Sequence, residues 1–228
     1  MFIGHFALAF AAKRAAPKLP LALLFTACQL ADILWPVFVA AGIESVRIAP
    51  GITAFTPLDF VSYPYSHSLV ALCLWGCVLG SACWLTGTTG RASLLVAGLV
   101  VSHWILDVVS HRPDMPIYPG SALWGLGLWN SVPATLIVEL LLFGSGVWIY
   151  ASATRERNAV GRWSFAGLVA FLLIAYFASI AGGPPPSVTA IFWVGIVGAL
   201  ILVVWSWWTD RNRQPAAPTT ATNSVISG

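Results

Sequence analysis

The chain has 228 residues, of which 58% are hydrophobic and only 8% are charged. Soluble domains carry roughly 25% charged residues, so this composition and a mean hydropathy of +0.84 predict an integral membrane protein. The net charge of +3 is too small to indicate a nucleic-acid partner. The four cysteines lie in apolar segments without a Cys-x-x-Cys pair, so they indicate neither a disulfide framework nor a zinc ribbon.

The predicted elements, taken in chain order, are all helical. Residues 2–12 predict a short apolar helix. This segment is too short to cross the membrane alone, since a full crossing needs about 20 residues. Longer apolar segments, with Trp and Tyr recurring near their ends as at membrane interfaces, then predict transmembrane helices. We therefore expect an all-α fold, a polytopic membrane helical bundle with one short N-terminal helix and about six transmembrane helices. The six predicted spans are 19–42, 67–86, 92–110, 131–151, 163–182 and 187–208.

The same pattern divides the chain into three regions. Residues 1–151 form a predicted helical membrane core that carries the metal site, and residues 152–208 add two transmembrane helices. Residues 209–228 form a predicted disordered cytoplasmic tail, because from Asp210 onward the chain is rich in Pro, Ala, Thr, Asn and Ser and lacks apolar content.

Basic residues predict the orientation. Nine of the eleven Lys and Arg residues fall on the side of loops 13–18, 87–91, 152–162 and the C-terminal segment, and the positive-inside rule makes that side cytoplasmic. We expect a multi-pass protein of the inner (plasma) membrane with a cytoplasmic C-terminus, and segments 43–66 and 111–130 outside. Residues 13–28 loosely mimic a lipoprotein signal, but the apolar helix before their basic residues is wrong for a signal peptide.

Three ionisable side chains, His103, Asp107 and His111, follow one another at four-residue intervals inside an apolar run. On an α-helix this spacing places all three on one face. Ionisable groups at membrane depth are costly, so they indicate a functional site whose groups have partners. A buried structural hydrogen bond is the alternative for each residue taken alone, and an interfacial position is the alternative for His111.

Polar residues from other predicted helices reach a similar depth on the outer side, and all four histidines of the chain belong to this set. Imidazole and carboxylate groups are the ligands of catalytic Zn²⁺ and Mn²⁺. The set therefore predicts a site for one or two divalent ions, with zinc expected first and manganese as the alternative. The residues that join the face on 103–111 are His5, Asp32, His67 and Glu139.

The predicted roles differ within the set. His111 is about 12 Å from His103 along a continuous helix axis, so it predicts a ligand of a second ion or a contact with substrate. Glu139 and His111 are the candidate acid–base groups, and either is also a candidate additional ligand. Ser66 is a predicted helix N-cap that would place His67 among free amides able to meet a phosphate. The primary ligand candidates are His5, Asp32, His67, His103 and Asp107.

Several of these residues stand in recognisable blocks: His5 in Gly-His-Phe, Asp32, Pro-Tyr-Ser-His-Ser-Leu at 64–69, and Ser-His-Trp-Ile-Leu-Asp at 102–107 with His111. Over roughly residues 1–145 they resemble the YdjM-like family of predicted inner-membrane metal-dependent hydrolases. The order of ligands is also similar, more distantly, to that of zinc-dependent phospholipases C. Those enzymes have a His four residues before their last Glu, where this chain has Thr135.

The sequence thus leads to a membrane-embedded metal-dependent hydrolase that acts on a phosphoester or another ester at the extracytoplasmic side. The ion would activate water for the attack. The expected partners are the lipid bilayer and a phospholipid or phosphoester substrate. The alternative is a proton or metal-ion transporter that uses the same His and carboxylate groups, although no broken helix is predicted. A noncatalytic membrane scaffold is the third interpretation.

Overall fold

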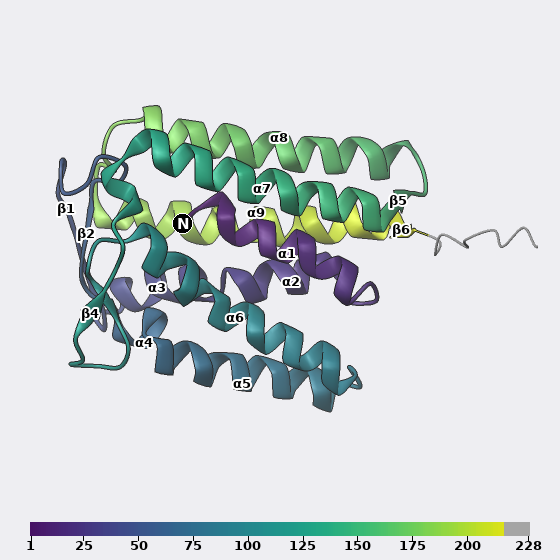
Figure 1. Ribbon diagram of the computed structural model, residues 1–228, viewed down its shortest axis with the longest axis horizontal. Helices are drawn as coiled ribbons and strands as arrows, with labels where there is room; N and C mark the ends of the chain where they lie inside the picture. Colours follow the sequence, from purple (N-terminus) through teal and green to yellow (C-terminus); the bar gives the residue numbers. More distant parts are fainter. Residues whose placement is uncertain (217–228) are drawn as a thin grey trace, which may run out of the picture.

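The computed structural model describes residues 1–216, and these residues are mostly helical (Figure 1). The described part of the chain contains nine α-helices, with a short 3₁₀ turn at Leu128–Asn130. The helices are α1 (Ile3–Ala15), α2 (Leu21–Cys28), α3 (Leu30–Ala40), α4 (Pro64–His67), α5 (Leu69–Leu85), α6 (Gly90–Ser110), α7 (Val132–Ala153), α8 (Ala159–Ala181) and α9 (Val188–Arg211).

Four helices, α6 to α9, are long and apolar enough to cross a membrane, within residues 1–216. The pair α2 and α3 also passes this test as one unit, but it is bent by 55° and so is either a broken span or a re-entrant loop. The prediction of one continuous helix over 19–42 is therefore wrong. Helix α5 has 17 residues and is a shorter apolar helix. The structure thus supports four or five spans, compared with the six expected.

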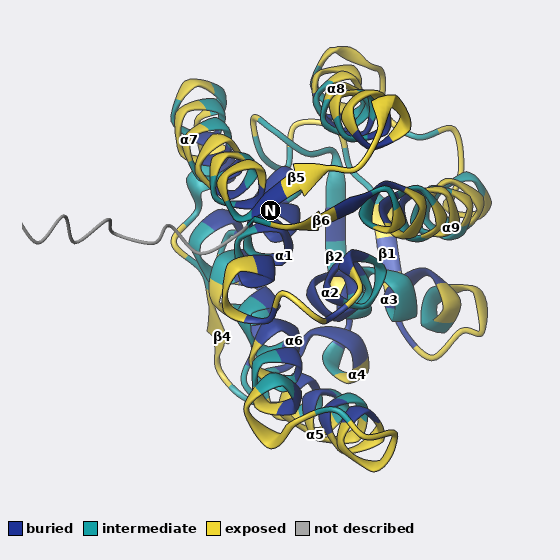
Figure 2. Ribbon diagram, turned by 90° about the vertical axis from the view of Figure 1, so that its right-hand side faces the viewer, coloured by how far each residue is buried: buried dark blue, intermediate teal, exposed yellow. Residues whose placement is uncertain are grey.

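The short helix α1 lies in the middle of the bundle, with α7 packed closely along it (Figure 2). A Cβ atom on Gly146 of α7 would lie only 2.3 Å from the carbonyl oxygen of Ala7, so only glycine permits this approach. The core around α1 and α2 contains Phe10 and Phe25. The outer faces of α5 to α9 instead expose large apolar side chains, as helices surrounded by lipid require.

Three small antiparallel sheets, which the all-α prediction did not include, lie at the two ends of the bundle (Figure 1). We call the end with the first two sheets the hairpin end, and the other the β5–β6 end. The strands at the hairpin end are β1 (Ser45–Ile48) with β2 (Leu58–Ser62), and β3 (Met115–Pro116) with β4 (Leu123–Trp124). Those at the other end are β5 (Thr154–Glu156) and β6 (Arg213–Pro215).

The first residues of the predicted tail are part of the fold. Helix α9 continues to Arg211, and β6 pairs with β5 after it. Asp210 accepts a hydrogen bond from Lys13 Nζ at 2.6 Å, which joins the C-terminal end of α9 to the end of α1. The rest of the predicted tail, residues 217–228, lies outside the described residues.

Candidate metal centre

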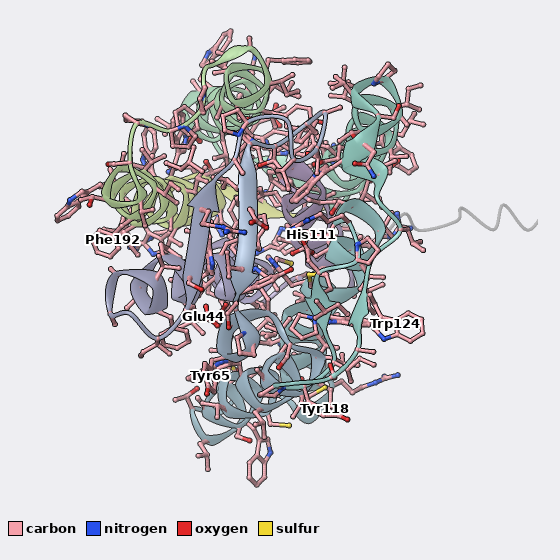
Figure 3. All side chains as sticks on the ribbon, turned by 90° about the vertical axis from the view of Figure 1, so that its left-hand side faces the viewer. Glu44, Tyr65, His111, Tyr118, Trp124 and Phe192 are labelled. Carbon is pink, nitrogen blue, oxygen red and sulfur yellow. The ribbon has the colours of Figure 1, made fainter. Side chains whose placement is uncertain are left out.

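Helix α6 and the residue that follows it supply three side chains of a His/Asp cluster at the hairpin end. His103 Nε2 lies 3.1 Å from Asp107 Oδ2. The helix ends at Ser110, and His111 has an extended backbone with φ −68° and ψ 151°. Its ring can therefore turn back, so that Nε2 lies 3.8 Å from Asp107 Oδ2. His111 points into the centre of this end, whereas Tyr118 and Trp124 lie at its rim (Figure 3). The rings of His103 and His111 thus approach the same carboxylate oxygen, Asp107 Oδ2.

Three other helices complete the cluster. From α1, His5 stacks on His103 with ring centroids 3.8 Å apart, and its Nε2 lies 3.1 Å from Asp107 Oδ1. From α4, His67 Nε2 lies 3.4 Å from Oδ1 of Asp32, which belongs to α3. The four histidines and Asp107 are buried, and the Asp32 side chain is 43% exposed.

Two overlapping groups in this cluster could hold a metal ion. One consists of His5, His103 and Asp107, and the other of Asp32, His67 and His103. Within each group the ligand atoms all lie within 4.8 Å of one another. Together they contain the five residues that the sequence nominated as primary ligands. His111 lies beside Asp107 but outside both groups, so its role as a ligand stays a prediction.

The histidine rings are oriented by their Nδ1 atoms. His103 Nδ1 lies 2.7 Å from the carbonyl oxygen of Cys28, which can only accept, so Nδ1 carries the hydrogen. Ser66 donates its hydroxyl hydrogen to Glu44, and its oxygen, 2.7 Å from His67 Nδ1, is left to accept from that ring. In their neutral forms both rings would present the Nε2 lone pair to the cluster, the arrangement that metal-binding histidines use.

When His103 is neutral, this arrangement brings its Nε2 lone pair to face a carboxylate oxygen. His103 Nε2 is buried and forms no hydrogen bond within the described residues, yet it lies 3.1 Å from a carboxylate oxygen of Asp107. A cation between such atoms would remove their repulsion. His103 belongs to both groups and has only one free nitrogen, so the geometry fits one ion shared by both groups better than two separate ions.

A cationic group already lies against Asp107. The Met1 amino group contacts Oδ1 and donates a hydrogen bond to Ser110 Oγ at 2.9 Å. His103, His67 and His111 all approach the other carboxylate oxygen, Oδ2. The two oxygens of Asp107 thus serve different partners.

The break between α2 and α3 helps to build the centre. Because α2 ends at Cys28, the carbonyl of this residue is among the terminal groups without a partner in their own helix. It accepts the hydrogen bond from His103 that fixes the ring. Helix α3 starts at Leu30 in a new direction and presents Asp32 in its first turn. A straight helix over 19–42 would provide neither feature.

Glu44, which sequence reasoning missed, secures His67. Its Oε1 accepts hydrogen bonds from the amides of Tyr65 and Ser66 at 2.8 and 2.9 Å, and its Oε2 accepts from Ser66 Oγ at 2.6 Å. The amides predicted to meet a phosphate therefore bind this carboxylate. The prediction of Ser66 as N-cap is also wrong, because Ser68 caps α5 and accepts from the amide of Ala71. His67 is the last residue of α4.

Glu139 is fully buried and holds the start of α1. Its Oε2 accepts hydrogen bonds from the amides of Phe2 and Gly4 at 2.9 and 3.1 Å, which positions the helix that carries His5. Its Oε1 forms no hydrogen bond in the described part of the chain. The predicted acid–base role of Glu139 stays a prediction. Thr135 donates to carbonyls of Leu128 and Ser131, so it is satisfied close to its own helix.

His111 belongs to a second polar network that the sequence did not reveal. Its Nδ1 lies 2.9 Å from Asp114 Oδ1, and Tyr63 donates its hydroxyl hydrogen to the same oxygen at 2.9 Å. Burial lowers the pKa of His111, so the ring is neutral at pH 7. Burial and then the charge of Asp114 raise the pKa of Tyr63 well above its usual range, so its hydroxyl stays a donor.

Two arginines continue this network at the surface. Arg112 contacts Asp59 and donates to Asp114 at 3.2 Å, and Arg47 pairs with Asp59 at 2.5 Å. Asp59 is therefore a buried ion-pair partner on β2. Glu44, Tyr63 and Asp114 are each a single polar residue in an extramembrane segment. Only their tertiary contacts identify them as part of these networks.

A cavity of about 280 Å³ lies against the cluster, and His67, Asp107 and His111 form part of its wall. Trp35 and Trp129 also line it. Both indole Nε1 atoms are buried and have no hydrogen-bond partner among residues 1–216. The cavity wall therefore combines imidazole and carboxylate groups with two indole side chains.

The fold and the cluster together define a helical protein with candidate membrane spans and a buried His/Asp group that could hold a metal ion. The chain matches no protein-family model, and comparison with curated proteins and with solved structures found no match.

Proposed function

We propose that this protein is a membrane-embedded, metal-dependent hydrolase that cleaves a phosphoester. The convergence of His103 Nε2, His67 Nε2 and the carboxylates of Asp32 and Asp107, with the ring nitrogens turned inward as lone pairs, carries the proposal. Zinc is the proposed ion, because nitrogen and carboxylate ligands of this kind form catalytic zinc sites. The resemblance to the YdjM-like family supports the same activity.

Each part of the site has a proposed task. His5, Asp32, His67, His103 and Asp107 would hold the ion, which when bound supplies Lewis acidity and activates water. Trp35 and Trp129 would form part of the wall of the cavity that receives the phosphoryl group. His111, neutral and with Nδ1 facing Asp114, would accept a proton at Nε2.

The distribution of basic residues supports an extracytoplasmic location for the proposed site. The segments that carry Lys13, Arg91 and Arg155 lie at the β5–β6 end, and the cluster lies at the hairpin end (Figure 1). The positive-inside rule then supports an extracytoplasmic site in the inner membrane, with the C-terminal end of α9 on the cytoplasmic side.

The test combines metal content with hydrolysis. Purified protein is expected to contain about one zinc per chain and to hydrolyse 4-nitrophenyl phosphate or phosphatidylglycerol, and His103→Ala should lose both properties. Gly98→Ala on the same helix is the matched control, because an added Cβ there meets nothing within 4 Å. Wild-type protein that binds metal but hydrolyses neither compound would contradict the hydrolase, and equal zinc in His103→Ala would contradict the site.

A second candidate, a proton or metal-ion transporter, is favoured by one observation. The pair α2 and α3 is broken beside the cluster, and ion sites of transporters are typically built at broken helices. Measurements of ion flux and ester hydrolysis in proteoliposomes distinguish the two candidate functions. Zinc or proton flux that requires Asp32 and Asp107, without ester hydrolysis, would replace the hydrolase with the transporter.

A further inference from the structure

A second cavity, of about 300 Å³, lies beside the cluster between α1, α2 and α3 on one side and α8 and α9 on the other. Its wall is apolar except for Gln29 and Asp32, and includes the rings of Phe6, Phe25 and Phe171. We call it the apolar cleft. It extends from Val194 to Leu202 on α9, about 12 Å at 1.5 Å per residue.

The apolar cleft lies next to the candidate metal centre and shares wall residues with the cavity there. Asp32, a proposed ligand, lines the apolar cleft as well as the cavity beside His67, Asp107 and His111. Phe2 also lines both. A molecule with its polar end at the cluster could therefore extend an apolar part past Asp32 and into the cleft.

The apolar cleft also opens toward the surface of α9, the least buried of the four long spans. Val194, in its wall, is 73% exposed. Gly198 leaves the middle of the wall unfilled, because a Cβ atom there would meet nothing within 4 Å. The two polar residues of the wall, Gln29 and Asp32, both lie on the α2–α3 side, and the α9 side of the wall is apolar.

From this juxtaposition we infer that the apolar cleft binds a hydrocarbon chain of the substrate, which makes the substrate a lipid phosphoester. The inference rests on the proposed hydrolase and specifies its substrate class. The headgroup lies against His67, Asp107 and His111, and the chain lies between α2 and α9. Burial of methylene groups in such a wall provides affinity that a water-soluble phosphoester lacks. Helices α8 and α9, beyond the region of family resemblance, thus provide substrate selection.

The first test compares phosphatidylglycerol carrying palmitoyl chains with phosphatidylglycerol carrying hexanoyl chains. Wild-type protein should prefer the longer chains, and Gly198→Leu, which fills the cleft, should reduce this preference in kcat/KM by about tenfold, since it displaces several methylene contacts. Gly144→Leu on α7 is the matched control, because an added Cβ also meets nothing within 4 Å there. An unchanged preference in a folded Gly198→Leu protein would overturn the inference.

The second test does not depend on catalysis. Phosphatidylglycerol with a diazirine in its acyl chain should crosslink to the cleft-lining segments of α2, α3 and α9 in both the wild-type protein and Asp107→Asn. Crosslinks confined to the outer faces of α5 and α7 would overturn the cleft as the chain site. Hydrolysis of 4-nitrophenyl phosphate in the same preparation separates this failure from failure of the proposed hydrolase, because that substrate has no acyl chain.

Discussion

Each end of the bundle contains an aspartate whose side chain has little solvent exposure, and the two aspartates differ in the groups that surround them. At the β5–β6 end, Asp210 accepts from Lys13 Nζ at 2.6 Å, from the amide of Leu21 at 3.2 Å and from the hydroxyl of Tyr150 at 3.3 Å. Every contact is a donor meeting an acceptor. This network is complete, and it ties α1, α2, α7 and α9 together.

At the hairpin end, Asp107 is surrounded by four imidazole rings, and at least two nearby rings have their Nδ1 hydrogen engaged elsewhere. When these rings are neutral, the Nε2 lone pairs of His67 and His103 face carboxylate oxygens. Buried polar groups in folded proteins are normally paired, so the unpartnered His103 Nε2 supports the proposed metal ion at this end. The β5–β6 end, by contrast, holds an ion pair between Lys13 and Asp210.

The largest effect is expected from a substitution in the cluster at the hairpin end. Asp107→Asn should lower zinc affinity by more than about 100-fold, because a neutral amide replaces the carboxylate shared by the cluster. Asp210→Asn should leave the affinity unchanged, since it lies in the other network. Equilibrium dialysis against a zinc-buffered solution measures both variants, and an equal loss in the two would remove the distinction between the ends.

The next largest effect is expected from a substitution in the ion pair at the β5–β6 end. Lys13→Met leaves Asp210 buried without its cation, and breaking such a pair typically reduces stability by about 3–5 kcal/mol. Denaturant unfolding in detergent gives this value, and zinc content per folded chain should stay at the wild-type level. A stability loss below about 1 kcal/mol would place the pair with weak surface salt bridges.

A smaller effect is expected from a substitution that disturbs the orientation of His67 at the hairpin end. Glu44→Gln weakens the hydrogen bonds that orient Ser66 and His67, and losses of this kind lower metal affinity by about 10- to 100-fold. Ser93→Ala is the control, because Ser93 is buried and its hydroxyl has no partner in the described residues. If Glu44→Gln bound zinc as tightly as Ser93→Ala, His67 would not depend on this orientation.

The smallest effect concerns pH. The folded pKa of Tyr63 is raised, so its contribution to stability is fully present below the unfolded value of about 10 and is lost as pH rises toward the folded pKa. Tyr63→Phe cannot lose a proton there, and its stability should fall less steeply above this pH than that of the wild type. Unfolding curves on both sides of pH 10 compare the two slopes, and identical slopes would contradict the burial of this hydroxyl.

Much of the helical framework could be predicted from the sequence, because an apolar run of membrane-crossing length leaves the backbone few alternatives to helix. The spans expected at 131–151 and 187–208 correspond to α7 and α9. The break after Cys28 could not be predicted in this way, since residues 19–42 are apolar throughout most of their length and carry no internal Gly. In the structure this break is accompanied by packing against α6, where His103 donates a hydrogen bond to the carbonyl oxygen of Cys28.

For the candidate site, the ligand candidates could be predicted from the sequence alone. Four histidines and a few carboxylates in an apolar chain must find partners, and helical spacing with alternating loops brings them to one end. The tertiary structure decided the rest: which nitrogen of each ring points inward, that His111 folds back beside Asp107, and that Glu44 and Asp114 orient the rings. These features depend on contacts between segments far apart in the chain, and no local pattern encodes them.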